Sequence, residues 1–192
     1  MLDKIKQLRG ETGVSFAECK KALEETGGDI NKALAALHKA SLKIAEKKSE
    51  RETGAGIIEA YIHLNGKVGA LLDLRCETDF VAKNPEFKEF AHNIALQITA
   101  LKPKFVCRED ISEAVREELS AVFKKETEKL NKPQEILEKI IAGKMEAVYK
   151  EEVLMEQPFV KNQDTTVSDL IRQAIQKFGE NIKIARFTRY EL

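Results

Sequence analysis

The chain contains 192 residues, and its 32 basic side chains are balanced by 32 acidic ones. This length suits one ordinary domain or two small ones, and the balanced charge excludes an overall field that would attract nucleic acid or an anionic membrane. No apolar run reaches the length of a membrane span, so no membrane partner is expected.

The first residues and the cysteines predict a cytoplasmic protein. The segment Met1–Lys4 enters a helical pattern directly, without a signal or transit sequence. Cys19, Cys76 and Cys107 are odd in number, lie far apart and form no CxxC pair. That spacing favours free thiols in a reducing cytosol over a disulfide framework.

Residues 1–40 predict three short helices. Ser15 and Glu18 have the spacing of a capping box before the second helix, and Asp29 is placed to cap the third. A bundle of this size buries little apolar surface, so its favoured role is to present a binding surface. Its pattern of turns resembles the ubiquitin-associated fold, which is a compact binding module.

The next segment, residues 41–53, is rich in both charges and fits either a helical extension or a mobile connector. We interpret it as a charged linker between two domains. The sequence therefore predicts a three-helix domain (1–40), a linker (41–53) and a core domain (54–192).

The core domain is predicted to begin with a β-hairpin whose turn lies at Asn65-Gly66. A two-residue turn would pair Leu64 with Lys67 and place the apolar sets of the two strands on opposite faces of the sheet. A three-residue loop places both sets on one face, so we predict an odd-length loop with Ile62 and Val68 on the same side. The two sets are Ile58, Ala60, Ile62 and Leu64 on the first strand, and Val68, Ala70, Leu72 and Leu74 on the second.

The rest of the chain is mostly helical and ends in a strand. A two-stranded ribbon is marginal alone, so the β-branched segment Asn181–Phe187 is predicted to add a third strand to the hairpin. The fold class is α+β, with the N-terminal bundle followed by a small antiparallel sheet packed with helices. The other predicted elements are a helix that Asn84 caps and Pro85 begins, a charged helix over Ser112–Leu130, a break at Asn131-Lys132-Pro133, helical turns over 136–153, loops at 157–160 and 162–165, and a helix over Val167–Phe178.

A search for catalytic or metal-binding motifs finds little. His38, His63 and His92 lie far apart, and none has a His or Cys at metal-ligand spacing. The sequence contains no GxxxxGK[ST], GxGxxG, GxSxG or HExxH motif. Basic residues interleave with acidic ones, so no basic stripe suits a phosphate backbone. We predict no enzymatic activity, cofactor, metal ion or direct contact with nucleic acid, and an enzyme whose site follows no known motif is the remaining alternative.

The most informative stretch is Thr78-Asp79-Phe80-Val81, which places an aromatic side chain beside a carboxylate between a strand and a helix. A phenylalanine at such a corner either fills the local core or is offered to a partner. The surrounding residues 76–83 resemble the signature of the elongation factor Ts family. Other stretches match that family in the same order along the chain, which is stronger than any single match: Leu8–Gly13 with Cys19–Leu23, Gly28–Ile30, and Gly179–Ile182.

This resemblance implies a guanine-nucleotide exchange factor for the GTPase elongation factor Tu, bound in its GDP-bound and nucleotide-free states. It implies that Asp79 and Phe80, flanked by Thr78 and Val81, act as a wedge in the GTPase domain and disturb its Mg²⁺ site. GDP is then held more weakly.

The resemblance also implies that the N-terminal bundle docks on the GTPase domain. Lys20 and Lys21 are weaker candidates for that contact, and an exposed helix face without function explains them equally well. The chain carries one copy of the hairpin-and-helix unit, as in short members of the family, so a homodimer is expected to supply two. An adaptor for ubiquitin-like or ribosome-associated partners is the alternative, and it explains residues 1–40 but not the rest.

Overall fold

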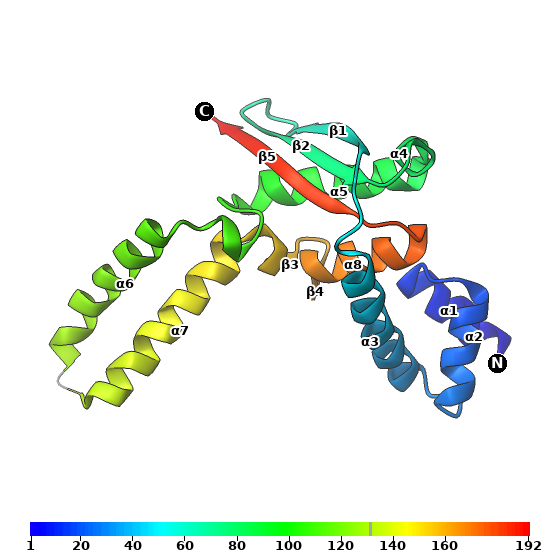
Figure 1. Ribbon diagram of the computed structural model, residues 1–192, viewed down its shortest axis with the longest axis horizontal. Coiled ribbons are helices and arrows are strands. Elements are labelled where there is room, and N and C mark those ends of the chain that lie inside the picture. The colour runs from blue at the N-terminus through cyan, green and yellow to red at the C-terminus, as the bar shows by residue number, and fades with distance from the viewer. Residues whose placement is uncertain (131) are drawn as a thin grey trace. The chain divides into compact units, whose positions relative to one another are not determined.

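The computed structural model describes residues 1–130 and 132–192, and Figure 1 labels their elements along the chain. Helices and a small antiparallel sheet confirm the α+β class. The predicted break at Asn131-Lys132-Pro133 includes Asn131, which lies outside the described residues. The chain groups into two compact units. Unit 1 comprises Met1–Glu59, Leu72–His92 and Ser168–Ala185, and unit 2 comprises Ala60–Leu71, Asn93–Val167 and Arg186–Leu192.

The N-terminal bundle has the predicted helices and caps. The Ser15 hydroxyl oxygen accepts from the Glu18 backbone N–H at 3.3 Å, and the Asp29 carboxylate accepts from the Lys32 N–H at 3.1 Å. The helices are α1 (Leu2–Thr12), α2 (Phe16–Glu25) and α3 (Ile30–Lys48). Their shared core consists of Ile5, Leu8, Val14, Cys19, Ala22, Leu23, Ala33 and Leu37.

Helix α3 does not stop at residue 40. It continues to Lys48, and Ser41 is buried within it at 2% exposure. Most of the segment that we interpreted as a linker is therefore a helical extension, because its charges lie on a helix that also buries a face. The Lys48 ammonium donates to the Gly179 carbonyl oxygen within unit 1. The division into independent domains 1–40 and 54–192 stays a prediction.

The main sheet contains the predicted third strand. The strand order is β1-β2-β5, so the C-terminal segment pairs with the second strand of the hairpin. The strands are β1 (Ala55–Ile62), β2 (Val68–Cys76) and β5 (Lys183–Glu191).

The register of β1 and β2 contradicts the predicted hairpin. The His63 N–H donates to the Val68 carbonyl oxygen at 2.9 Å, and a side chain placed at Gly69 would meet Ile62 Cγ1 at 3.4 Å. His63 therefore lies opposite Val68 and Ile62 lies opposite Gly69, so Ile62 and Val68 face opposite sides of the sheet. The prediction of an odd-length loop was wrong.

The geometry of the loop explains why Ile62 and Val68 face opposite sides of the sheet. The Gly66 N–H donates to the His63 carbonyl oxygen at 2.8 Å, and the Lys67 N–H donates to the Asn65 side chain at 3.0 Å. Asn65-Gly66 thus forms the turn within the loop 64–67, which has an even number of residues. Each face of the hairpin consequently carries one apolar set. Ala70, Leu72 and Leu74 are buried, whereas Ile58 and Ile62 are 58% and 72% exposed.

The segments after the sheet follow the predicted order with one correction. The Asn84 side chain accepts from the Glu86 N–H at 2.9 Å and caps a helix that begins at Pro85, as predicted. The segments predicted as loops at 157–160 and 162–165 instead contain two short antiparallel strands, because Phe159 is buried and pairs with Asn162. The elements are α4 (Asp79–Lys83), α5 (Pro85–Leu101), α6 (Glu113–Thr127), α7 (Gln134–Glu152), β3 (Pro158–Phe159), β4 (Asn162–Thr166) and α8 (Val167–Phe178).

Among the described helices, none is long and apolar enough to cross a membrane. In unit 1, the Phe87 ring of α5 meets the Phe178 ring at the end of α8 edge-on, with 5.6 Å between the centroids. Phe87 is fully buried. This aromatic pair joins α5 to α8 beside the point where the chain enters β5.

Candidate functional site

The corner between β2 and α4 presents Phe80 to solvent. Thr78 has an extended backbone (φ −129°, ψ 155°) and stands directly before α4, which begins at Asp79. Phe80 follows on the first turn and is 90% exposed, whereas Ala82 is buried. The chain thus turns from strand to helix and directs its aromatic side chain outward, so Phe80 does not fill the core of this chain.

Asp79 and Val81 complete the predicted site on either side of Phe80. The Asp79 carboxylate is 76% exposed, and the Lys83 ammonium lies 3.8 Å from it across one turn of α4. An exposed pair of this kind contributes little to stability. Val81 is half-buried. The corner therefore offers a carboxylate and an aromatic ring side by side, both accessible to a partner.

Glu180 holds this corner from the end of α8. One oxygen of its carboxylate accepts from the backbone N–H groups of Glu77 and Thr78, each at 3.0 Å. The other oxygen accepts from the Thr78 hydroxyl at 2.6 Å. Thr78 therefore uses its hydroxyl on Glu180 instead of capping α4. Hydrogen bonds to an ionised carboxylate are stronger than those between neutral groups.

Asn181 and Glu77 add a second set of bonds around the same corner. The Asn181 N–H donates to the Glu77 carboxylate at 2.6 Å. The Asn181 side-chain amide donates to the carbonyl oxygens of Arg51 at 2.8 Å and Ser49 at 3.3 Å. Asn181 is 1% exposed, so these bonds satisfy a buried amide. They connect the segment after α3, the end of β2 and the start of β5.

Cys76 supports the corner from inside. Its thiol is buried and lies 3.3 Å from the Thr78 carbonyl oxygen, to which it donates. Burial raises the pKa of the Cys76 thiol, and the Glu180 carboxylate raises it further. A protonated buried thiol is a poor nucleophile. Cys76 therefore acts as a structural donor, and burial likewise raises the pKa of the Cys107 thiol to about 11.

Lys20 and Lys21 lie on the exposed side of α2 in the bundle. Each pairs with a glutamate one turn later, Lys20 with Glu24 at 3.7 Å and Lys21 with Glu25 at 3.9 Å. Within the described part of the chain, no hydrogen bond or ion pair joins either lysine to the corner at Thr78.

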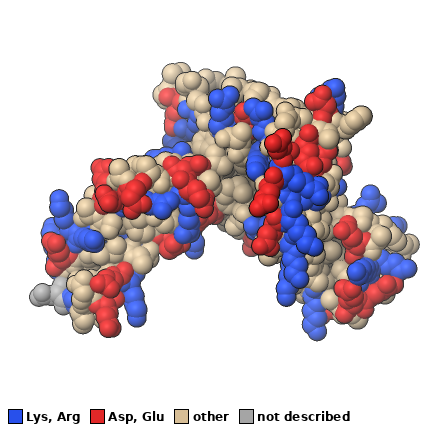
Figure 2. All heavy atoms as spheres, viewed as in Figure 1, with Lys and Arg blue, Asp and Glu red and all other residues tan. Residues whose placement is uncertain are grey.

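Charges of both signs are intermixed over the face shown in Figure 2. On this face, basic side chains gather along α3. Lys39, Lys43 and Lys47 are exposed there at helical spacing. This run departs from the even interleaving of charges expected from the sequence, but it is confined to one helix.

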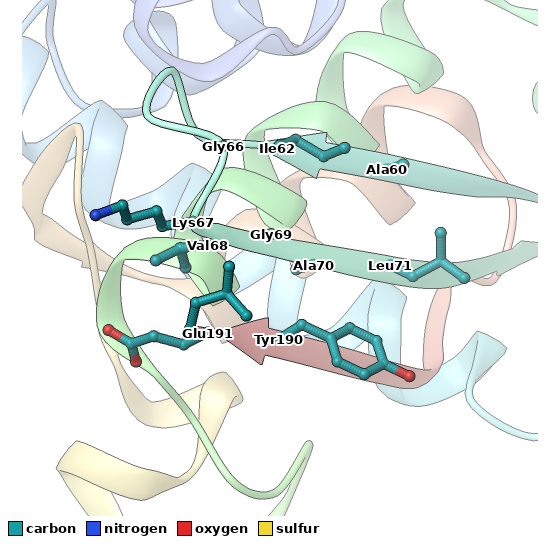
Figure 3. Close-up of a pocket in the computed structure, with 11 residues that line it drawn as sticks. Ala60, Ile62, Gly66, Lys67, Val68, Gly69, Ala70, Leu71, Tyr190 and Glu191 are labelled. Carbon is teal, nitrogen blue, oxygen red and sulfur yellow. The ribbon is translucent and has the colours of Figure 1, made fainter.

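The open face of the sheet in unit 2 is apolar. A hollow of about 340 Å³ lies on it, and Figure 3 shows Ile62, Leu71 and Tyr190 among the side chains that line it. These three side chains are 72%, 49% and 74% exposed. This surface, which we call the open sheet face, includes Ala60, Ile62, Gly69, Leu71 and Tyr190.

Sequence reasoning identified the corner but not the residues that hold it. In the sequence, Glu180 and Asn181 stand out only as part of a family pattern, and Glu77 only as part of the signature. Thr78 and Glu180 lie 102 residues apart, and no local spacing relates them. The available signal is weak: two polar residues between the glycine that ends a helix and a β-branched strand.

Comparison with known proteins gives a consistent result. The family model described as elongation factor TS matches residues 14–192. Elongation factor Ts of Coprothermobacter proteolyticus is 50% identical over 188 residues, which cover 98% of this chain and 95% of the relative. Those of Thermotoga neapolitana and Carboxydothermus hydrogenoformans are each 47% identical, covering 100% and 98% of this chain and 96% and 87% of the relative. The chain belongs to the elongation factor Ts family.

Proposed function

We propose that this chain is a guanine-nucleotide exchange factor that binds elongation factor Tu with GDP bound, promotes GDP release and remains bound to the nucleotide-free form. The observation that carries the proposal is Phe80, 90% exposed at a corner held by hydrogen bonds, in a chain of this family. The factor acts by binding and catalyses no covalent step. Its place of action is the cytoplasm, where translation elongation occurs.

The exchange follows from coupling between two ligands of the GTPase. If this factor weakens GDP binding, GDP weakens the binding of the factor by the same ratio. The interactions that the corner makes only in the nucleotide-free state supply this coupling. A ring and a carboxylate that are already exposed meet the partner without first unfolding a core, so little of the binding energy is spent on rearrangement.

The target of the wedge is the Mg²⁺ site of the GTPase. Mg²⁺ requires nearly ideal octahedral oxygen geometry, so a small displacement of its ligands or waters weakens it strongly. Loss of the divalent charge leaves the diphosphate of GDP less well neutralised. Asp79 and Phe80, flanked by Thr78 and Val81, are the residues that we assign to this displacement.

The test is the release of a fluorescent GDP from elongation factor Tu with and without this chain. We expect the chain to accelerate release, and the acceleration to shrink when a chelator has already removed Mg²⁺. Unchanged release at saturating concentrations of the chain would refute the exchange function. An equal acceleration with and without Mg²⁺ would refute the proposed target while leaving exchange intact.

Lys20 and Lys21 are proposed as a secondary contact of the bundle. Replacing both by alanine is expected to weaken binding to elongation factor Tu roughly two- to fivefold, as for charges at the rim of an interface, with a smaller loss at high salt. The melting temperature should stay unchanged, because both side chains are exposed. Lys32→Ala is the control, because Lys32 is an exposed lysine of the same bundle that is paired within its own helix region. Equal effects of the two variants would remove this assignment.

We also propose that two copies of the chain associate through the open sheet face. Sheets in proteins bury apolar faces by packing against one another, and a two-fold axis lets one face serve as its own partner. Ile62 and Leu71 are apolar and accessible. Ile62 lies opposite Gly69, so two residues further along each strand Ala60 lies opposite Leu71, and all four residues are on the same face of the sheet. Exposed apolar patches of this kind mark interaction sites.

The oligomeric state tests this association. Leu71→Asp is expected to shift sedimentation equilibrium from a dimer to a monomer of 21.7 kDa, because a carboxylate cannot be buried unpaired in an apolar interface. Leu64→Asp is the matched control, since Leu64 is 99% exposed in the hairpin loop and does not line the hollow. A wild-type chain that sediments as a monomer at high concentration would contradict the proposal.

A further inference from the structure

The direction of Phe80 depends on bonds outside its own helix. Helix α4 spans only Asp79–Lys83, and a helix of five residues is not stable by itself in water. Strand β2 ends at Cys76, so its sheet hydrogen bonds stop before the corner. The two residues between strand and helix, Glu77 and Thr78, must therefore be held by other groups.

Glu180 is the group that holds both of these residues. Its carboxylate receives three donors, the N–H groups of Glu77 and Thr78 and the Thr78 hydroxyl. Gly179 makes this placement feasible, because its left-handed backbone (φ 73°) ends α8 and turns the chain toward the corner. Both carboxylate oxygens are occupied within the chain, which leaves Glu180 poorly placed to act as a contact for a partner.

We propose that Glu180 is a positioning residue for nucleotide exchange, which fixes the corner so that Phe80 and Asp79 point outward before the partner arrives. This inference rests on the proposed exchange function. Glu180 acts through Thr78, and its contribution is pre-organisation: without it, the corner must be ordered during binding, which lowers the affinity for the nucleotide-free GTPase and the exchange rate. It assigns a role to Glu180 in the pattern Gly179-Glu180-Asn181-Ile182.

A double-mutant cycle tests the inference on the full chain. Glu180→Ala is expected to slow stimulated GDP release about tenfold, which corresponds to roughly 1.4 kcal/mol. In a chain that already carries both Asp79→Ala and Phe80→Ala, the same substitution should have no further effect, because the two side chains that it positions are absent. Additive losses in the cycle would overturn the inference, since they would mean that Glu180 acts independently of Asp79 and Phe80.

Two further variants separate positioning from general stability. Glu180→Gln keeps the length and an acceptor for the two N–H groups, and its amide can donate to the Thr78 hydroxyl oxygen, so it should restore most of the exchange rate. Thr78→Val removes only the hydroxyl bond and should give a smaller loss than Glu180→Ala. A Gln variant as defective as the Ala variant would overturn a role based on these hydrogen bonds.

Amide hydrogen exchange gives a readout that a merely structural role would not move. In Glu180→Ala, the amides of Glu77 and Thr78 should exchange faster while amides of the α1–α3 core keep their protection. A uniform loss of amide protection would assign Glu180 to global stability instead. So would a fall in melting temperature with an unchanged rate of stimulated GDP release per folded molecule.

If Phe80→Ala alone leaves GDP release unchanged, the proposed wedge fails. If Phe80→Ala is defective and Glu180→Ala is not, only the present inference fails.

Discussion

Replacing Phe80 by alanine is expected to slow stimulated GDP release from elongation factor Tu by about 30-fold, which corresponds to the roughly 2 kcal/mol typical of an aromatic interface anchor. The stability of the free chain should hardly change, because the ring is 90% exposed and makes no core contact that alanine would remove. The measurements are the melting temperature and the rate of fluorescent GDP release for each variant.

Phe87→Ala provides a matched control seven residues along the chain. The same substitution at Phe87 deletes a fully buried ring that packs edge-on against Phe178, so it should cost about 3–5 kcal/mol of unfolding free energy. The rate of stimulated GDP release per folded molecule should change much less than it does in Phe80→Ala. The two phenylalanines are thus expected to give opposite results, and a large fall in melting temperature for Phe80→Ala with normal exchange would remove the wedge.

Asp79 can be tested beside Phe80 without changing shape. Asp79→Asn removes the charge but keeps the side-chain volume, and the partner Lys83 is itself exposed, so the fold should be retained. A loss of exchange in Asp79→Asn would indicate that the wedge needs a negative charge near the Mg²⁺ site. Retained exchange would leave Phe80 as the main group of the corner.

Local signals in the sequence predicted the local structure well. Ser15, Asp29 and Asn84 cap helices as their residue types suggest, because each supplies an oxygen to a free backbone N–H within three residues. The third strand was also predicted, since a lone hairpin needs a neighbour to be stable. The exposure of Phe80 could not be decided from the sequence, where both alternatives remained open.

Two of the features that the sequence did not predict depend on distant or paired residues. The predicted register of the hairpin was wrong because we assumed that both apolar sets must be buried together. The observed register instead places Ile62 and Val68 on opposite sides of the sheet, with Ile62 on the open sheet face. An apolar set that an even-length loop places on the exposed face of a sheet therefore points to an interaction surface. The Glu180–Thr78 contact joins residues 102 positions apart, and no periodic pattern encodes it.

The second large expected effect concerns Gly56, near the start of β1. Gly56 has a φ of 156°, and a Cβ at this position would lie 2.3 Å from the Leu74 carbonyl oxygen and 2.9 Å from Arg75 Cα. These are backbone atoms and cannot move aside as a flexible side chain can. Unfavourable backbone conformation alone costs roughly 1–3 kcal/mol, and the overlap adds to it, so Gly56→Ala should lose more than about 2 kcal/mol of unfolding free energy.

The same substitution should also impair exchange, because Arg75 lies just before the residues that form the corner. If β1 separates from β2 at Gly56, the end of β2 that leads to Cys76 and Thr78 loses the strand that it pairs with. Phe80 should then point outward in a smaller fraction of the molecules. Gly54→Ala is the matched control, since nothing lies within 4 Å of a Cβ there. Urea unfolding and GDP release of the two variants decide the matter. Equal stability of Gly56→Ala and Gly54→Ala would show that the strands do not approach as closely as described, and the corner would then need another support.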